Sequence, residues 1–191
     1  YNWFSFYKVS RKTRGRENSF FHRFYSLNKL LLIVFAKAPI KGEVKIRLGK
    51  TIEMEKSKWV YIQLLHHTAK VTRKSKIDTI LFENQASKEL HSIFYHSKQY
   101  LIQEGINLGN KMEAAFRWAF KQDYKKVILI GSDLWTLNEE TLFEADHALE
   151  QNDFVIGPSY DGGYFLIGMK KFNPKVFKNI PWSTNQVLKE T

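Results

Sequence analysis

Hydrophobic and polar residues form blocks along this chain that predict strands separated by helices. The uninterrupted apolar run 30–36 ends in a loop with Pro and Gly, which is typical of a strand buried on both faces. Residues 127–130 form a similar run. Over 110–122, apolar residues recur at the spacing of a helix with one buried face. The other expected elements are helices at 51–73, 87–95, 138–150 (capped by Asn138), 173–177 and 184–188, strands at 78–82, 154–156 and 164–167, and a short strand or loop at 100–103.

This alternation predicts an α/β domain over residues 29–191. We expect three layers, α/β/α, around a mostly parallel sheet. Ligands of such sheets bind beyond the carboxyl ends of the strands, so the loops that follow the strands are the first place to look for a site.

Residues 1–28 differ in composition from the rest of the chain. They hold six basic residues against one acid, Glu17, and show no period of 2 or 3.6. We expect this extension to be disordered or artefactual; the alternative is an arm that contacts nucleic acid or a membrane. The chain has no cysteine, which suits a cytoplasmic protein, and no apolar run approaches the ~20 residues of a membrane helix.

The loop after the first strand is rich in cationic side chains. Lys37, Lys45 and Arg47 are suited to phosphate oxygens, and Gly42 lets backbone N–H groups approach an anion. The loop is not a Walker A motif. It predicts a diphosphate site, or else it is an ordinary exposed basic loop.

Asp133 follows the strand 127–130 and would reach the same edge of the sheet as the basic loop. A carboxylate there could hold Mg²⁺ or Mn²⁺ against a diphosphate. The simpler interpretation is an aspartate that forms a turn or caps the next segment.

Two further loops contribute candidates. Gln103, Gly105 and Asn107 precede the 110–122 helix and could border a nucleotide, although an ordinary loop with a helix cap has the same pattern. The Asp-Gly step at 161–162 is a strong hairpin signal. The same loop could also form an acceptor-binding wall, made of Asp161, Gly162, Gly163 and Tyr164.

Taken in order, these motifs resemble a known family of small bacterial GT-A-like proteins. The matching stretches are Phe35-Ala36-Lys37-Ala38-Pro39-x-x-Gly42-x-Val44-Lys45-x-Arg47-Leu48, Gln103-x-Gly105-x-Asn107-Leu108-Gly109-x-x-Met112, Gly131-x-Asp133, Gly157-Pro158-x-x-Asp161-Gly162-Gly163-Tyr164-x-Leu166-Ile167-Gly168 and Pro181-Trp182-Ser183. That family includes glycosyltransferases, some connected with arsenosugar biosynthesis, and is similar to the molybdenum-cofactor and phospholactate guanylyltransferases. The resemblance implies the fold of nucleotide-diphospho-sugar transferases.

The chain departs from the family pattern in four places, one of which is Lys111, where an arginine usually precedes the family methionine. Ile46 stands where a threonine is usual, and Leu134-Trp135 replaces Cys-Pro after the aspartate, which could reshape a metal site. The family also continues past residue 191 into an Asp-x-Asp-like element, so the chain is either truncated or has an incomplete site.

The resemblance implies a metal-assisted glycosyltransferase that uses a nucleotide sugar and a small-molecule acceptor. Asp133 would hold the cation, Lys37, Lys45 and Arg47 would neutralise the diphosphate, and Asp161 would act on the acceptor. The alternatives are a guanylyltransferase-like enzyme that takes an NTP and releases pyrophosphate, or a degenerate domain that binds nucleotide or nucleic acid without catalysis. We expect nucleic acid not to be the partner. The oligomeric state is not predicted.

Overall fold

One mixed sheet organises the part of the chain that the computed structural model describes, residues 7–9 and 30–191. Its order is β1-β6-β7-β5-β2-β3-β4. The strands are β1 (Tyr7–Val9), β2 (Leu30–Ala36), β3 (Asp78–Glu83), β4 (Gln99–Ile102), β5 (Lys126–Gly131), β6 (Phe154–Pro158) and β7 (Tyr164–Met169). β2 pairs in parallel with β3 and β5, and β3 with β4; β7 runs antiparallel between β5 and β6, and β1 is antiparallel to β6. Because β7 is antiparallel to both β5 and β6, the five strands β2 to β6 run in one direction and β1 and β7 run in the other, so the prediction of a mostly parallel sheet is confirmed.

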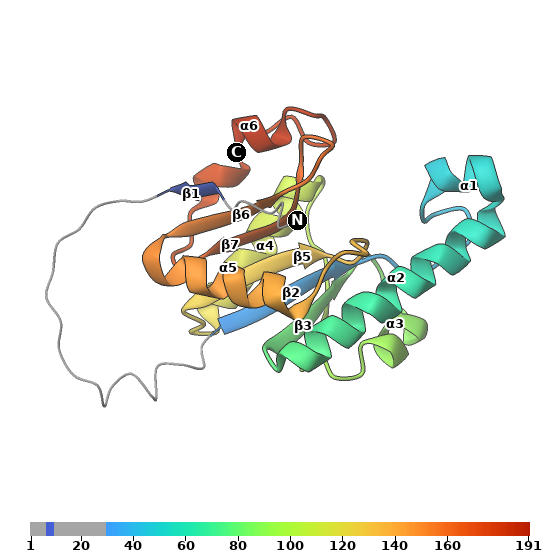
Figure 1. Cartoon of the computed structure of the whole chain (residues 1–191), viewed down its shortest axis with the longest axis horizontal. Coiled ribbons are helices and arrows are strands. Elements are labelled where there is room, and N and C mark those ends of the chain that lie inside the picture. The colour runs from blue at the N-terminus through green and yellow to red at the C-terminus, as the bar shows by residue number, and fades with distance from the viewer. Residues whose placement is uncertain (1–6, 10–29) are drawn as a thin grey trace, which may run out of the picture.

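Helices cover both faces of this sheet. They are α1 (Ile46–Ile52), α2 (Met54–Ser75), α3 (Lys88–Ile93), α4 (Leu108–Lys121), α5 (Glu139–Gln151), the 3₁₀ helix η1 (Pro174–Phe177) and α6 (Val187–Glu190). α2, α3 and α5 pack on one face, and α4 with η1 packs on the other, which confirms the three-layer prediction (Figure 1). α1 and the first turns of α2 project beyond the sheet (Figure 1).

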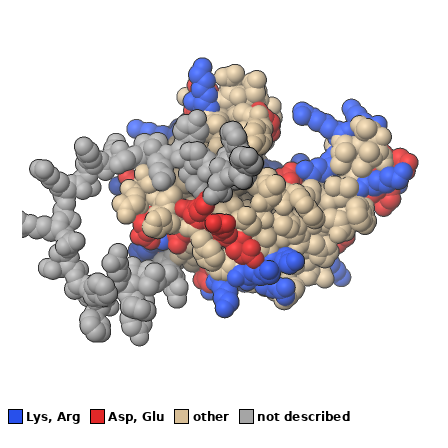
Figure 2. Space-filling view, in the orientation of Figure 1, with Lys and Arg blue, Asp and Glu red and all other residues tan. Residues whose placement is uncertain are grey.

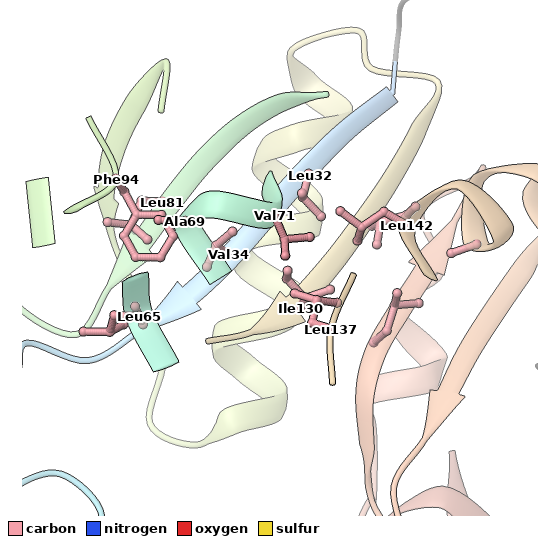
Figure 3. Packing of buried hydrophobic residues seen from close by; sticks show 14 of the residues in the cluster. Leu32, Val34, Leu65, Ala69, Val71, Leu81, Phe94, Ile130, Leu137 and Leu142 are labelled. Atoms are coloured by element: carbon pink, nitrogen blue, oxygen red, sulfur yellow. The ribbon is translucent and has the colours of Figure 1, made fainter. Parts of the chain in front are cut away.

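The first apolar run is continuous because β2 is buried on both sides. Leu32 and Val34 pack under α2, where they meet residues such as Leu65 and Ala69 (Figure 3). The alternate residues, including Leu31 and Ile33, pack against the α4 layer. Each layer therefore holds β2 in place, and the loop that follows Ala36 begins from a fixed point.

The structure corrects some of the expected element bounds. The expected helix at 51–73 is two helices, because Glu53 adopts a positive φ of 76° and ends α1 before α2 begins. The helix expected at 184–188 is shifted along the chain, because α6 begins at Val187 and ends at Glu190. Asn138 does cap α5, since its side chain accepts the Thr141 N–H at 2.8 Å.

Most of the predicted extension 1–28 lies outside the described residues; within it, residues 7–9 form β1 at one edge of the sheet. Among the residues that are described, none of the helices has the length and apolar character needed to cross a membrane.

Candidate functional site

Two of the predicted residues from distant parts of the chain meet at the carboxyl edge of the sheet. The Lys45 ammonium lies 2.8 Å from Oδ2 of Asp133. Their loops leave β2 and β5, which are neighbouring parallel strands with Phe35 opposite Gly131. The pair stands at a cavity of about 220 Å³, whose lining is Phe35, Ala36, Lys37, Val44, Lys45, Tyr61, Gln103, Leu108, Gly131, Ser132 and Asp133. The cationic loop and the carboxylate thus share one cavity.

The backbone of the loop after β2 directs Lys45 toward this cavity. The Ala38 N–H donates to Oδ1 of Asn84 at 2.7 Å, which fixes the start of the loop to the segment after β3. Gly42 turns the chain with a φ of 81°. Lys45 itself is left-handed, with a φ of 46°, immediately before α1. Left-handed backbone is costly for a residue with a Cβ, so its neighbours must hold this conformation in place.

Tyr61 is a site residue that sequence reasoning missed. It lies on α2, is buried, and lines the cavity. Its hydroxyl accepts the Lys37 N–H at 2.9 Å and lies 3.3 Å from the Ser132 hydroxyl, so it joins the loop after β2 to the loop after β5. Burial raises the pKa of Tyr61, so the hydroxyl stays protonated at neutral pH. In the sequence, Tyr61 is only one aromatic residue within a helical stretch.

We expect Tyr61→Phe to destabilise the protein by about 1–3 kcal/mol, because the part-buried Lys37 N–H loses its acceptor. Urea unfolding of the two proteins measures this difference. If Tyr61→Phe unfolds at the same urea concentration as the wild type, the hydroxyl does not hold the two loops together.

Some of the other residues predicted to bind phosphate line the cavity, and some do not. Lys37 and Gln103 line the cavity with Lys45. Arg47 is exposed on α1 and does not line it, and neither does Gly42. The basic loop therefore brings two cations to the cavity and carries the third outward on the projecting helix. Figure 2 shows basic side chains gathered on this projection.

The side chains of the loop before α4 make hydrogen bonds to main-chain atoms of the fold. The side chain of Gln103 donates to the carbonyl oxygens of Ala36 and Phe82, at 3.1 and 2.9 Å, and so closes the ends of β2 and β3. Asn107 accepts the Asn110 N–H and caps α4. Gly105 has a φ of 135° and no room for a Cβ beside the backbone of α4. Of these three residues, Gln103 lines the cavity, whereas Gly105 and Asn107 contact the start of α4 and do not line it.

The expected acceptor wall does not line the Asp133 cavity. Asp161 accepts hydrogen bonds from the Ser159 hydroxyl and the Gly163 N–H, and both lower the pKa of its carboxyl group. A carboxylate with a lowered pKa is a weak general base. Tyr164 packs against Trp182 with ring centroids 6.5 Å apart, and burial raises its pKa.

Gly162 instead borders a second, larger groove of about 970 Å³ beside α6 and η1. Its Cα lies against the main chain of Asn185, so the hairpin between β6 and β7 is covered by the C-terminal segment. The antiparallel pairing of β6 with β7 confirms the prediction that the Asp-Gly step at 161–162 lies in a hairpin.

The two residues that follow Asp133 turn away from the cavity. Leu134 packs against the core, and Trp135 stacks on His67 of α2 with ring centroids 4.9 Å apart. His67 also donates to the Leu137 carbonyl oxygen at 2.8 Å. Neither Leu134 nor Trp135 lines the cavity that holds Asp133.

Among the residues that line the cavity, Asp133 is the one acid, which suits a cation held partly by its ligand. Among the described residues, no three His, Cys, Asp or Glu side chains gather as they would in a site made of protein alone. Mg²⁺ commonly takes one or two carboxylates and completes its shell with phosphate oxygens and water. Asp133, with two neighbouring lysines to share the phosphates, fits that arrangement.

Comparisons with known proteins identify the family and the fold. A family model described as "uncharacterized protein conserved in bacteria" (DUF2064) matches residues 67–184. A crystal structure from Desulfovibrio desulfuricans G20, whose name is that of a proposed nucleotide-diphospho-sugar transferase, is 29% identical, covers 86% of this chain and 74% of its own, and superposes with a TM-score of 0.78.

A second solved structure shares the fold at greater distance. It is the 4-diphosphocytidyl-2C-methyl-D-erythritol synthase of Anaerococcus prevotii DSM 20548, 14% identical, with a TM-score of 0.55 over 85% of this chain and 82% of that one. No protein with a curated description matches the chain. The fold is that of the nucleotide-diphospho-sugar transferases, as the sequence predicted.

Proposed function

The chain belongs to the DUF2064 family of bacterial proteins, and we propose that it is a transferase that binds the diphosphate of a nucleotide sugar between Lys45 and Asp133. The observation that carries this proposal is that Lys45 and Asp133, which are in contact at 2.8 Å, line one cavity at the ends of β2 and β5. The name of the similar protein from Desulfovibrio desulfuricans G20 points the same way.

The chain's own residues have distinct tasks in this proposal. Lys37 and Lys45 neutralise phosphate oxygens. Asp133 would hold Mg²⁺ or Mn²⁺, which when bound would stabilise the negative charge that develops on the leaving nucleotide. Tyr61 and Gln103 keep the surrounding loops in position through their hydrogen bonds.

A role for Asp161 as base receives no support from its surroundings. Its carboxylate is held by Ser159 and Gly163, and it lies on the hairpin outside the Asp133 cavity. We therefore propose that Asp161 shapes the hairpin through these two hydrogen bonds, and that the acceptor binds elsewhere along the carboxyl edge of the sheet.

A thermal-shift series with nucleotides and nucleotide sugars, with and without Mn²⁺, tests this proposal. A ligand that binds the native state at a hundred times its Kd stabilises it by about 2.7 kcal/mol. For a chain of this length that raises Tm by about 5–10 °C. We expect nucleoside diphosphates and one class of nucleotide sugar to give this shift only with Mn²⁺. No shift with any nucleotide would refute the proposal.

The product separates the reactions that remain possible at this site. Release of a nucleoside diphosphate identifies glycosyl transfer. Release of pyrophosphate from an NTP identifies nucleotidyl transfer instead, because the acceptor then attacks the α-phosphate. Mn²⁺-dependent binding without either product would identify a domain that binds nucleotide and has lost catalysis.

A further inference from the structure

The Asp133 carboxylate is paired with a cation of the chain itself, the Lys45 ammonium. Lys45 Nζ lies 2.8 Å from Asp133 Oδ2, on the same carboxylate that the proposed function assigns to a divalent ion. A metal that approaches Asp133 therefore meets a positive charge that must be displaced. Coulomb repulsion between a dication and an ammonium at this range is unfavourable even in water.

The ion pair is exposed enough to be broken. The side chain of Lys45 is 28% exposed and that of Asp133 is 59% exposed, and pairs of this kind contribute only about 0.2–1 kcal/mol. Among the hydrogen bonds and ion pairs of the described residues, Lys45 Nζ has no second acidic partner. A linked pair of phosphates supplies the acceptor that Lys45 needs when it leaves Asp133.

From this contact, and on the basis of the proposed function, we infer that Lys45 determines which species the site accepts. The site binds a divalent cation together with its diphosphate and disfavours the free cation. Free metal must compete with Lys45 for Asp133, whereas the metal–diphosphate complex gives Lys45 a new partner in the same step. Lys45 is thus a specificity-determining residue for the charged form of the substrate.

Lys41 offers a matched control on the same loop. It has the same charge, but its partner is Glu55 at 3.1 Å, and it does not line the cavity. Lys41→Met and Lys45→Met therefore each remove one ammonium group from the same loop. The first takes it from Glu55 and the second from Asp133. Lys45→Arg retains the cation at the site.

Isothermal titration of the full chain tests the inference, with Mn²⁺ and inorganic pyrophosphate as probes. The readout is the ratio of the affinities for the Mn²⁺–pyrophosphate complex and for free Mn²⁺. In Lys45→Met, we expect free Mn²⁺ to bind about threefold to tenfold more tightly and the complex about tenfold more weakly. The ratio therefore falls by more than tenfold, while Lys41→Met and Lys45→Arg keep a ratio near that of the wild type.

The outcomes separate this inference from the function on which it rests. If the wild type binds the complex and Lys45→Met leaves the ratio unchanged, Lys45 does not select the ligand species, and the proposed function stands. If Lys41→Met lowers the ratio as much as Lys45→Met, general loss of charge is the cause and the inference is wrong. If the wild type does not bind the complex at all, both proposals fail.

Discussion

Asp133→Asn is expected to reduce turnover by about a hundredfold to a thousandfold, because a neutral amide cannot hold the divalent cation that offsets charge on the leaving phosphate. The fold should persist, since the Asp133 side chain is more than half exposed and its one ion pair, with Lys45, is a surface pair. The measurement is release of nucleoside diphosphate from the donor that the thermal-shift series identifies. Circular dichroism then compares the two folds.

Asp123→Asn is the matched control for this prediction. Asp123 precedes β5 and Asp133 follows it, so the same change is made at opposite ends of one strand. Asp123 has a φ of 63°, which asparagine tolerates. Its turnover should equal that of the wild type. Full metal-dependent turnover in Asp133→Asn would show that this carboxylate holds no essential cation.

Gly162→Ala should lower the stability by about 2–5 kcal/mol, which corresponds to a Tm decrease of roughly 5–15 °C for this chain length. Two separate causes add here. Gly162 has a φ of 82°, where a Cβ is strained, and that Cβ would lie 2.2 Å from the main-chain oxygen of Asn185. The C-terminal segment must move away, which also breaks the bond from the Leu188 N–H to the Gly162 oxygen.

Gly42→Ala separates the two causes. Gly42 has nearly the same φ, 81°, and nothing lies within 4 Å of where its Cβ would be. Only the backbone strain remains, so the expected loss is about 1–2 kcal/mol. Equal losses in the two variants, measured by thermal or urea unfolding, would show that the C-terminal segment does not rest on the hairpin.

Much of the fold could be predicted because its signals are local. A strand such as β2, buried on both faces, is apolar throughout, and α4 carries its apolar residues at a regular helical spacing. The exceptions depend on contacts that no local pattern encodes. Glu53 ends α1 with a positive φ, and β7 inserts antiparallel between β5 and β6. Pattern alone gives no strand order in such a sheet.

The same distinction between local patterns and long-range contacts explains which site residues could be predicted. Lys45 and Asp133 were predictable because parallel strands bring their carboxyl ends to one edge. Arg47 was expected beside them, but α1 carries it outward, and this depends on the left-handed conformation of Lys45. Tyr61 could not be found from sequence, since it reaches the loops from α2 through burial and hydrogen bonds to main-chain atoms.

Trp182 lies against the first turn of α4, so close that a Cβ on Gly109 would sit 2.4 Å from its indole nitrogen. The neighbouring Leu108 lines the Asp133 cavity. The fluorescence emission of an indole depends on its immediate surroundings, so an indole in that position is sensitive to changes near the start of α4. Filling the cavity should therefore change the emission of Trp182, which adds to that of the four other tryptophans of the chain.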